Sequence, residues 1–259
     1  MPVLFINVKK NHHHLLVVKS SPSQSVPMVK IIDKINQSIS APFFSFEFFP
    51  PKTEAGVENL YLRMDRMTAL QPIFVDITWG AGGCTRDLTM AISEYTQTYF
   101  GVDALMHLTC TNLTLSNLKD ILKNARELGI QNILALRGDP PKGALQWEPI
   151  PGGCNNAIDL VKLIRKEHGE YFGIAVAGFP EGHPHSKESL QDEVRYLKQK
   201  VDAGADFVLT QFFYDPDVFI EFLQQCRDVG IRCPIIPGVN SYCIALYCII
   251  LYNIVLFIA

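Results

Sequence analysis

A short strand-like run followed by a helical pattern recurs about every 30 residues between Pro42 and Val239, which is the length of one βα unit. Apolar residues at helical spacing predict six helices between the runs. Strands that alternate strictly with helices return to the same end, so the pattern predicts an all-parallel sheet. The seven expected strands are Phe43–Phe49, Ile73–Trp79, Ala104–Cys110, Asn132–Arg137, Phe172–Gly178, Asp206–Phe212 and Pro234–Gly238.

Such a sheet can be open or closed. An open, doubly wound sheet usually carries Gly-x-Gly-x-x-Gly after its first strand, but here that position reads Glu47-Phe48-Phe49-Pro50-Pro51-Lys52. A closed barrel needs eight βα units in roughly 250 residues, and this chain supplies seven recognisable strands. We therefore predict an α/β fold, a (β/α)8 TIM-type barrel that is incomplete because its eighth βα unit is missing.

The two ends of the chain differ from the middle. Residues 1–40 form an irregular extension with a helix from about Met28, residues 41–239 form the barrel, and residues 240–259 form an apolar tail. The stretch from Ser241 to Ala259 has no charge and is long enough for a membrane anchor. A buried element and a mis-joined segment are the alternatives, and we favour the mis-joined segment. We do not expect it to close the barrel, which would leave strands one and seven with unpaired edges.

Charge and cysteine content exclude several classes of partner. The 23 Lys and Arg residues against 26 Asp and Glu give a net charge of −3, which does not suit a nucleic-acid-binding protein. The seven cysteines form no Cys-x-x-Cys pair, so we expect reduced thiols, a cytoplasmic location and no metal site. The run His12-His13-His14 lacks further ligands at fixed spacing and does not change this expectation.

Polar residues occur at nearly every predicted strand end. In a βα barrel the carboxyl ends of the strands surround the active site, so these positions are candidates for chemistry. They are Glu47, Thr78, Trp79, His107, Arg137, Gly138, Asp139, His183, His185, Thr210 and Gln211.

Glu47 stands among four phenylalanines, an apolar setting that should raise its pKa and suit a general acid. The alternative is a carboxylate paired with Arg137 or Lys52. His107 could equally be a satisfied core residue or a catalytic one. Gln211 could bind a planar heterocycle through hydrogen bonds of its side-chain amide, or it could cap a helix.

Five ordered motifs resemble the methylenetetrahydrofolate reductase family of the eukaryotic type, and the resemblance covers about Met28 to Val239. They are Phe44-Ser45-Phe46-Glu47-Phe48-Phe49-Pro50-Pro51-Lys52-Thr53, Asp76-Ile77-Thr78-Trp79-Gly80-Ala81-Gly82-Gly83, His107-Leu108-Thr109-Cys110-Thr111-Asn112, Leu134-Ala135-Leu136-Arg137-Gly138-Asp139-Pro140-Pro141 and Asp202-Ala203-Gly204-Ala205-Asp206.

The resemblance implies an FAD enzyme that uses NADH or NADPH to reduce 5,10-methylenetetrahydrofolate to 5-methyltetrahydrofolate, a step toward methionine. It also implies a homo-oligomer and a folate substrate. Glu47 matches the general acid, Asp139 the carboxylate near flavin and pterin, and Gln211 the amide that binds the pterin. The positions that match FAD-binding residues are Thr78, Trp79, His107, Arg137, Gly138, Asp139, Asn156, Ala157, Phe179, His183, Pro184, Glu193 and Lys200.

The sequence departs from the family at four places. Asn156 and Phe179 stand where the family commonly has tyrosines, and Glu193 stands where an aspartate is usual, so flavin affinity could be weaker. The family's pattern also stops after Val239, which suggests a C-terminally truncated form. Two alternatives therefore remain: an inactive fragment that associates with a full-length subunit, and a membrane-anchored flavoprotein.

Overall fold

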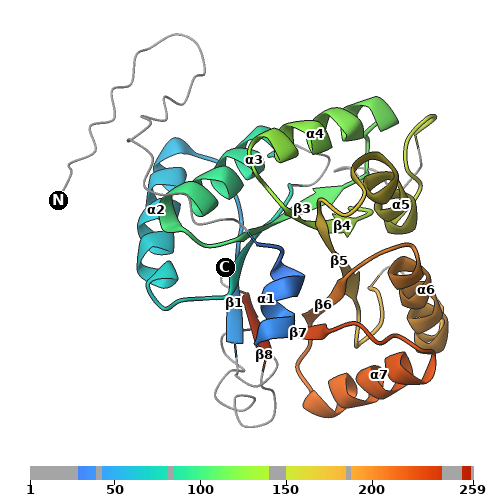
Figure 1. Ribbon diagram of the computed structural model, residues 1–259. Helices are drawn as coiled ribbons and strands as arrows, with labels where there is room; N and C mark the ends of the chain where they lie inside the picture. Colours follow the sequence, from blue (N-terminus) through green and yellow to red (C-terminus); the bar gives the residue numbers. More distant parts are fainter. Residues whose placement is uncertain are drawn as a thin grey trace.

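The protein folds as a closed barrel of eight parallel strands that neighbour one another in chain order (Figure 1). The computed structural model describes residues 29–38, 43–80, 85–139, 150–184 and 188–240, and the backbone of 253–257. The strands are β1 (Phe43–Phe48), β2 (Phe74–Ile77), β3 (Ala104–Thr109), β4 (Asn132–Leu136), β5 (Gly173–Gly178), β6 (Phe207–Phe212), β7 (Ile235–Asn240) and β8 (Asn253–Phe257). The prediction of a TIM-type α/β barrel is confirmed.

Helices connect the first seven strands, as the alternating pattern predicts (Figure 1). Before α2, α4, α6 and α7 a side chain accepts a free N–H group of the first turn, as Thr53, Thr114, Ser189 and Asp215 do, which fixes where those helices begin. The helices are α1 (Ile31–Gln37), α2 (Glu54–Thr68), α3 (Arg86–Tyr95) with the π-helical turn η2 (Thr96–Phe100), α4 (Leu115–Glu127), α5 (Ala157–His168), α6 (Leu190–Asp202) and α7 (Pro216–Asp228).

The expectation that the apolar tail leaves the barrel open is wrong. β8 comes from this tail and runs parallel to β1, with partners from Phe43 and Asn253 to Glu47 and Phe257. It also pairs with β7, where Gly238 lies opposite Val255. A short uncharged run rich in β-branched residues suits a strand buried in a parallel sheet. Residues 241–252, which connect β7 to β8, lie outside the described residues.

A short helix closes the amino-terminal end of the barrel. Ile31 and Ile35 of α1 pack against residues inside the barrel, including Phe74 and Leu105. The backbone N–H of Ile31 donates a hydrogen bond of 2.8 Å to Oδ1 of Asn132, the first residue of β4. The amino-terminal end of the barrel interior is therefore filled with apolar side chains. A polar site can form only at the carboxyl ends of the strands.

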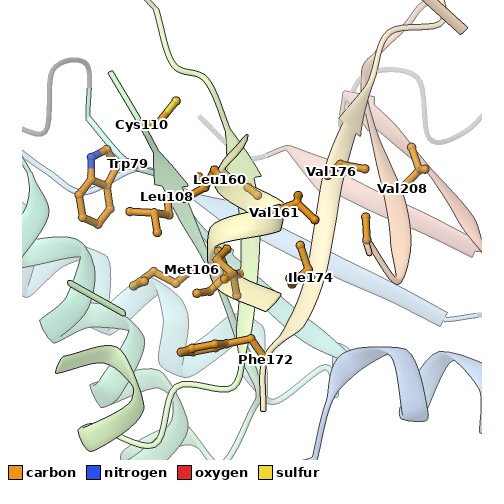
Figure 2. Packing of buried hydrophobic residues seen from close by; sticks show 14 of the residues in the cluster. Trp79, Met106, Leu108, Cys110, Leu160, Val161, Phe172, Ile174, Val176 and Val208 are labelled. Carbon is orange, nitrogen blue, oxygen red and sulfur yellow. The ribbon is translucent and has the colours of Figure 1, made fainter. Parts of the chain in front are cut away.

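A second apolar layer lies between the strands and the surrounding helices (Figure 2). Met106 of β3 and Ile174 of β5 point outward and belong to the same buried cluster as Leu160 and Val161 of α5. This layer anchors the helices to the barrel.

In the part of the chain that is described, no helix is long and apolar enough to span a membrane. Most of residues 241–259, on which the anchor alternative rests, lies outside that part.

Candidate active site

Glu47 points into the barrel and lies near the carboxyl end of β1. Successive side chains of a strand point to opposite faces, so Phe46 and Phe48 lie outside, in a cluster with Leu60 and Met64 of α2. The phenylalanines beside Glu47 in the sequence are therefore not its environment, contrary to the sequence interpretation. The side chain is buried, with 6% exposure, because the barrel encloses it.

Burial raises the pKa of Glu47 from its ordinary 4.5 to about 7. A positive charge on His107 lowers the pKa of Glu47 again, and a negative charge on Asp76 raises that pKa further. The predicted elevated pKa is thus present, although its cause differs from the one inferred from the sequence. A carboxyl group that holds a proton near neutral pH can act as a general acid.

Asp76 of β2 is a site residue that the sequence analysis did not single out. It is fully buried, and the Ser45 hydroxyl donates to its Oδ2 at 3.4 Å. Nε2 of His107 lies 3.6 Å from its Oδ1. Burial raises the pKa of Asp76 well above its ordinary value and lowers the pKa of His107. The sequence did contain a sign that Asp76 belongs to the site: it is an acidic residue in the middle of a buried strand, on the same face as Phe74 and Thr78.

Several buried polar atoms near the carboxyl ends of β2 and β3 have no hydrogen-bond partner within the described residues. Buried polar groups are normally paired, so such atoms indicate a place where a polar ligand can bind. His107 is consequently not a satisfied core histidine. The atoms are Asp76 Oδ1, Trp79 Nε1, His107 Nε2 and Thr109 Oγ1.

The turn after β4 has a backbone path that requires glycine. Gly138 has a φ of +92°, and a Cβ there would lie 2.8 Å from Cβ of Thr109 and 2.8 Å from Oγ1 of Thr111. The Thr111 hydroxyl donates to the carbonyl of Arg137 at 2.7 Å. This turn fixes half-buried Arg137 and exposed Asp139 at the carboxyl end of β4.

The loop after β5 is tied to α6 through several of the predicted residues. Lys200 is buried and donates to the carbonyl of Ala177 at 2.6 Å, and burial lowers its pKa to about 8. Its Nζ lies 5.9 Å from the ring centroid of Phe179. Oε2 of Glu193 accepts the backbone N–H of His183 at 2.8 Å. Four of the predicted FAD positions therefore form one group of contacts.

The remaining predicted residues lie at separate positions. Asn156 caps α5 by accepting the N–H of Asp159 at 3.0 Å, and buried Ala157 is the first residue of that helix. Thr78 is half-buried just after β2, and Pro184 is exposed in the loop after β5.

Gln211 is exposed near the carboxyl end of β6, at the same end of the barrel as Glu47. It does not cap a helix, since Asp215 caps α7. The helix-capping alternative for Gln211 is thereby set aside.

Known proteins resemble this chain over most of its length. The family model described as methylenetetrahydrofolate reductase matches residues 31–243. A relative from Arabidopsis thaliana, "Methylenetetrahydrofolate reductase (NADH) 1", is 52% identical over 223 residues, which cover 82% of this chain and 37% of the relative. "Methylenetetrahydrofolate reductase 2" of Saccharomyces cerevisiae is 48% identical over 217 residues, which cover 82% of this chain and 36% of that protein. This chain thus spans little more than a third of the length of these relatives.

A solved structure shares the fold at low sequence identity. It is an uncharacterized protein from Clostridium thermocellum that binds two copies of 5-methyl-5,6,7,8-tetrahydrofolic acid. It superimposes with a TM-score of 0.53 at 14% identity, covering 81% of this chain and 70% of that one. This likeness supports the barrel architecture alone.

Proposed function

This chain belongs to the methylenetetrahydrofolate reductase family, and on that premise we propose that it reduces 5,10-methylenetetrahydrofolate to 5-methyltetrahydrofolate. The proposed cofactor is FAD, and the proposed reductant is NADH or NADPH. The reaction would serve one-carbon metabolism and methionine synthesis. The observation that carries the proposal is a buried carboxyl group, Glu47, whose pKa of about 7 lets it deliver a proton at the mouth of the barrel.

The described residues fit a flavin. The unpaired polar atoms of Trp79, His107 and Thr109 would find partners on a polar heterocycle, and Gly138 permits the positive-φ turn that follows β4 beside Thr109. FAD would supply the hydride chemistry when bound. The residues proposed to hold it are Thr78, Trp79, His107, Arg137, Gly138, Asp139, Asn156, Ala157, Phe179, His183, Pro184, Glu193 and Lys200.

The protein's own part in the reaction is binding and proton delivery. Glu47 would donate its carboxyl proton to a ring nitrogen of the substrate's imidazolidine and so open that ring. The carboxylate of Asp139 and the amide of Gln211 would bind the flat, hydrogen-bonding pterin. Both residues are exposed near the carboxyl ends of their strands, which is where a substrate can reach them.

Two finer proposals concern the protein in the cell. Among the described cysteines, Cys110, Cys154, Cys226 and Cys233 are free thiols, which supports a reducing compartment, and we propose the cytoplasm. We also propose a homo-oligomer, as the family resemblance implies. Cell fractionation and light scattering test these two proposals, and a chain found in the membrane fraction would support the anchored alternative.

The activity is tested on the purified full chain in two half-reactions. We expect a yellow protein whose flavin absorbance bleaches with NADH or NADPH and returns when 5,10-methylenetetrahydrofolate is added. Glu47→Gln should keep the bleaching step and abolish the return, because only the folate step needs a proton donor. Asp139→Asn should alter both steps. A colourless protein, or equal loss of both steps in Glu47→Gln, would contradict the proposal.

A further inference from the structure

The register between β6 and β7 shifts by one residue near the carboxyl end of the barrel. Leu209 pairs with Ile236, but the next pair joins Phe212 to Gly238. An unbroken register would place Gln211 opposite Gly238, so β6 contains one extra residue between the two pairs. Such a β-bulge is rare between parallel strands, and bulges beside active sites typically change the direction of a side chain.

The hydroxyl of Thr210 replaces a backbone hydrogen bond at this bulge. Two residues earlier the ladder is regular, since the N–H of Val208 donates to the carbonyl of Pro234 at 2.9 Å. The same pattern would make the N–H of Gly238 donate to the carbonyl of Thr210. It donates instead to Oγ1 of Thr210, at 2.9 Å and in a buried setting. A buried N–H without an acceptor is costly, so the hydroxyl stabilises the shifted register.

The bulge changes which side chains face outward after it. Leu209 packs inside the barrel, and Val208 packs outside it, against the helices. Unbroken alternation would place Phe213 inside the barrel with Leu209. Phe213 instead is fully buried outside and stacks on Phe219 of α7, with 5.0 Å between the ring centroids. The extra residue thus lets the chain anchor Phe213 against α7 while Gln211 stays exposed at the end of β6.

We propose that Thr210 is a positioning residue whose hydroxyl holds the bulge and thereby fixes Gln211 at the mouth of the barrel. Thr210 is only 1% exposed, so it acts through Gln211 and not by touching a ligand itself. Without the hydroxyl, the Gly238 N–H loses its acceptor and the position of Gln211 on β6 is no longer fixed. The role of the bulge stands on the contacts between β6 and β7, and its consequence for pterin binding rests on the proposed function.

Steady-state kinetics of the full chain test this role through the difference between KM and kcat. Thr210→Val keeps the shape of the side chain and removes the acceptor. We expect it to raise the KM for 5,10-methylenetetrahydrofolate about tenfold and to change kcat by less than about twofold, because a displaced Gln211 weakens binding and takes no part in the chemical step. Thr210→Ser keeps the hydroxyl and should restore most of the wild-type KM.

A double-mutant cycle with Gln211→Ala distinguishes positioning from a general weakening of the barrel. If Thr210 acts through Gln211, Thr210→Val should raise KM by less than about twofold once Gln211 is already alanine. Thr96→Val is the matched control, because it removes another fully buried hydroxyl, which donates to the carbonyl of Ile92 at 2.7 Å, and it should leave KM unchanged. Effects of the two changes that multiply fully, or a wild-type KM in Thr210→Val, would overturn the proposal.

Hydrogen exchange of the Gly238 amide, measured by NMR without cofactor or substrate, tests the bulge itself. Phe213, anchored against α7, prevents the ladder from returning to a regular register, so this amide should exchange about tenfold faster in Thr210→Val and stay protected in Thr210→Ser. Unchanged exchange in Thr210→Val would overturn the proposal.

Thr210→Cys serves if the valine variant does not fold. A thiol is a weaker acceptor than a hydroxyl, so the same changes in exchange and KM should occur with smaller size, and their absence would overturn the proposal. The exchange measurement needs no turnover. A wild-type chain that shows the expected exchange but reduces no folate would therefore contradict the proposed function and leave the contact between Thr210 and Gly238 in place.

Discussion

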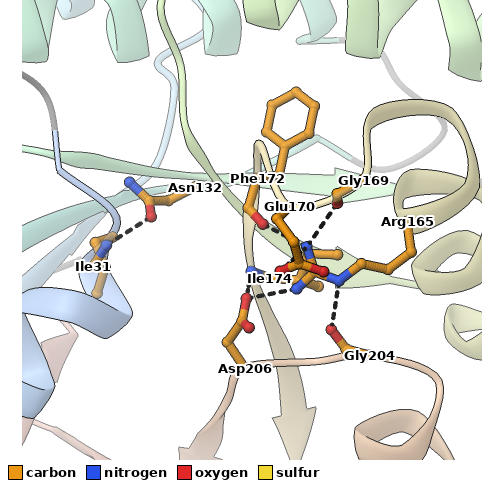
Figure 3. Close-up of polar contacts among 9 residues, drawn as sticks. All are labelled: Ile31, Asn132, Arg165, Gly169, Glu170, Phe172, Ile174, Gly204 and Asp206. Atoms are coloured by element: carbon orange, nitrogen blue, oxygen red, sulfur yellow. Dashed lines mark hydrogen bonds and ion pairs between the residues drawn. The ribbon is translucent and has the colours of Figure 1, made fainter.

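Arg165 and Asp206, which lie 41 residues apart in the sequence, form an ion pair with 2.7 Å between Nη2 and Oδ2 (Figure 3). The same carboxyl oxygen accepts the backbone N–H of Ile174 at 2.7 Å. The guanidinium also donates to the carbonyl of Gly204 at 2.9 Å and to that of Phe172 at 2.7 Å. One side chain of α5 therefore joins the starts of β5 and β6, at the end of the barrel opposite to Glu47.

Replacing Arg165 by methionine should destabilise the fold without changing the site. The variant removes the guanidinium that pairs with the Asp206 carboxylate and donates to three backbone carbonyls, those of Gly169, Phe172 and Gly204. This loss should lower the free energy of unfolding by about 3 kcal/mol. Urea denaturation measures this loss. Arg195→Met, which removes an exposed pair with Asp192 on α6, is the control and should have little effect. Normal stability of Arg165→Met, or loss of flavin binding in its folded fraction, would contradict this assignment.

Glu47→Gln should change how stability depends on pH. Because the folded-state pKa is raised from 4.5 to about 7, folded wild type holds a proton in this window that the unfolded chain releases. Wild-type stability contributed by this group is therefore present below pH 4.5 and is lost as pH rises through about 7. The glutamine variant lacks this loss, so its stability relative to wild type should increase by on the order of 3 kcal/mol across the window.

Urea denaturation of both proteins at several pH values measures this difference. The gain should be complete just above pH 7 and constant beyond it. Two stability curves that run parallel between acid and neutral pH would show that the Glu47 carboxyl is not perturbed by folding.

The sequence predicted the barrel and the end of the barrel that carries the site, because both follow from local periodicity. It did not predict that Asp76 of β2 lies beside Glu47 of β1. Which residues face Asp76 depends on strand register and on closure of the barrel, and neither is encoded in the neighbouring sequence. For the same reason the sequence interpretation took Phe46 and Phe48 as the environment of Glu47, whereas alternation along the strand places them on the opposite face.

The eighth strand could not be recognised for a related reason. A short, uncharged apolar run is compatible with a buried strand, a buried helix or part of a membrane segment, and periodicity does not distinguish them. Asn253–Phe257 becomes a strand because β1 and β7 present unpaired edges on both sides of it. Those edges exist only once the rest of the barrel has formed, so no local sequence pattern predicts that β8 pairs with β1 and β7.

Gly138→Ala should weaken flavin binding more than it affects the rest of the fold. An alanine at a φ of +92° is strained, and its Cβ would also meet Thr109 and Thr111 at 2.8 Å each, so the turn that positions Arg137 and Asp139 must move. We expect at least a tenfold loss of FAD affinity, equivalent to about 1.4 kcal/mol, measured by flavin fluorescence titration.

Gly152→Ala is the matched control for this experiment. Gly152 also has a positive φ, +73°, but a Cβ there has nothing within 4 Å. In both variants an alanine at positive φ strains the backbone by about 1 kcal/mol. Only the Gly138 variant also brings a Cβ into a steric clash with Thr109 and Thr111. Equal FAD affinities in the two variants would show that the Gly138 turn does not shape the site.

Val255→Pro tests whether β8 closes the barrel. Val255 pairs with Ser45 of β1 on one side and with Gly238 of β7 on the other. Proline lacks the N–H that a central strand needs, so the substitution should release β8 and expose the edges of β1 and β7. We expect soluble aggregates by light scattering and loss of the high pKa of Glu47, because water then reaches β1. Val255→Thr keeps the backbone N–H and should remain unaggregated, whereas a monodisperse proline variant with an unchanged Glu47 would contradict the pairing.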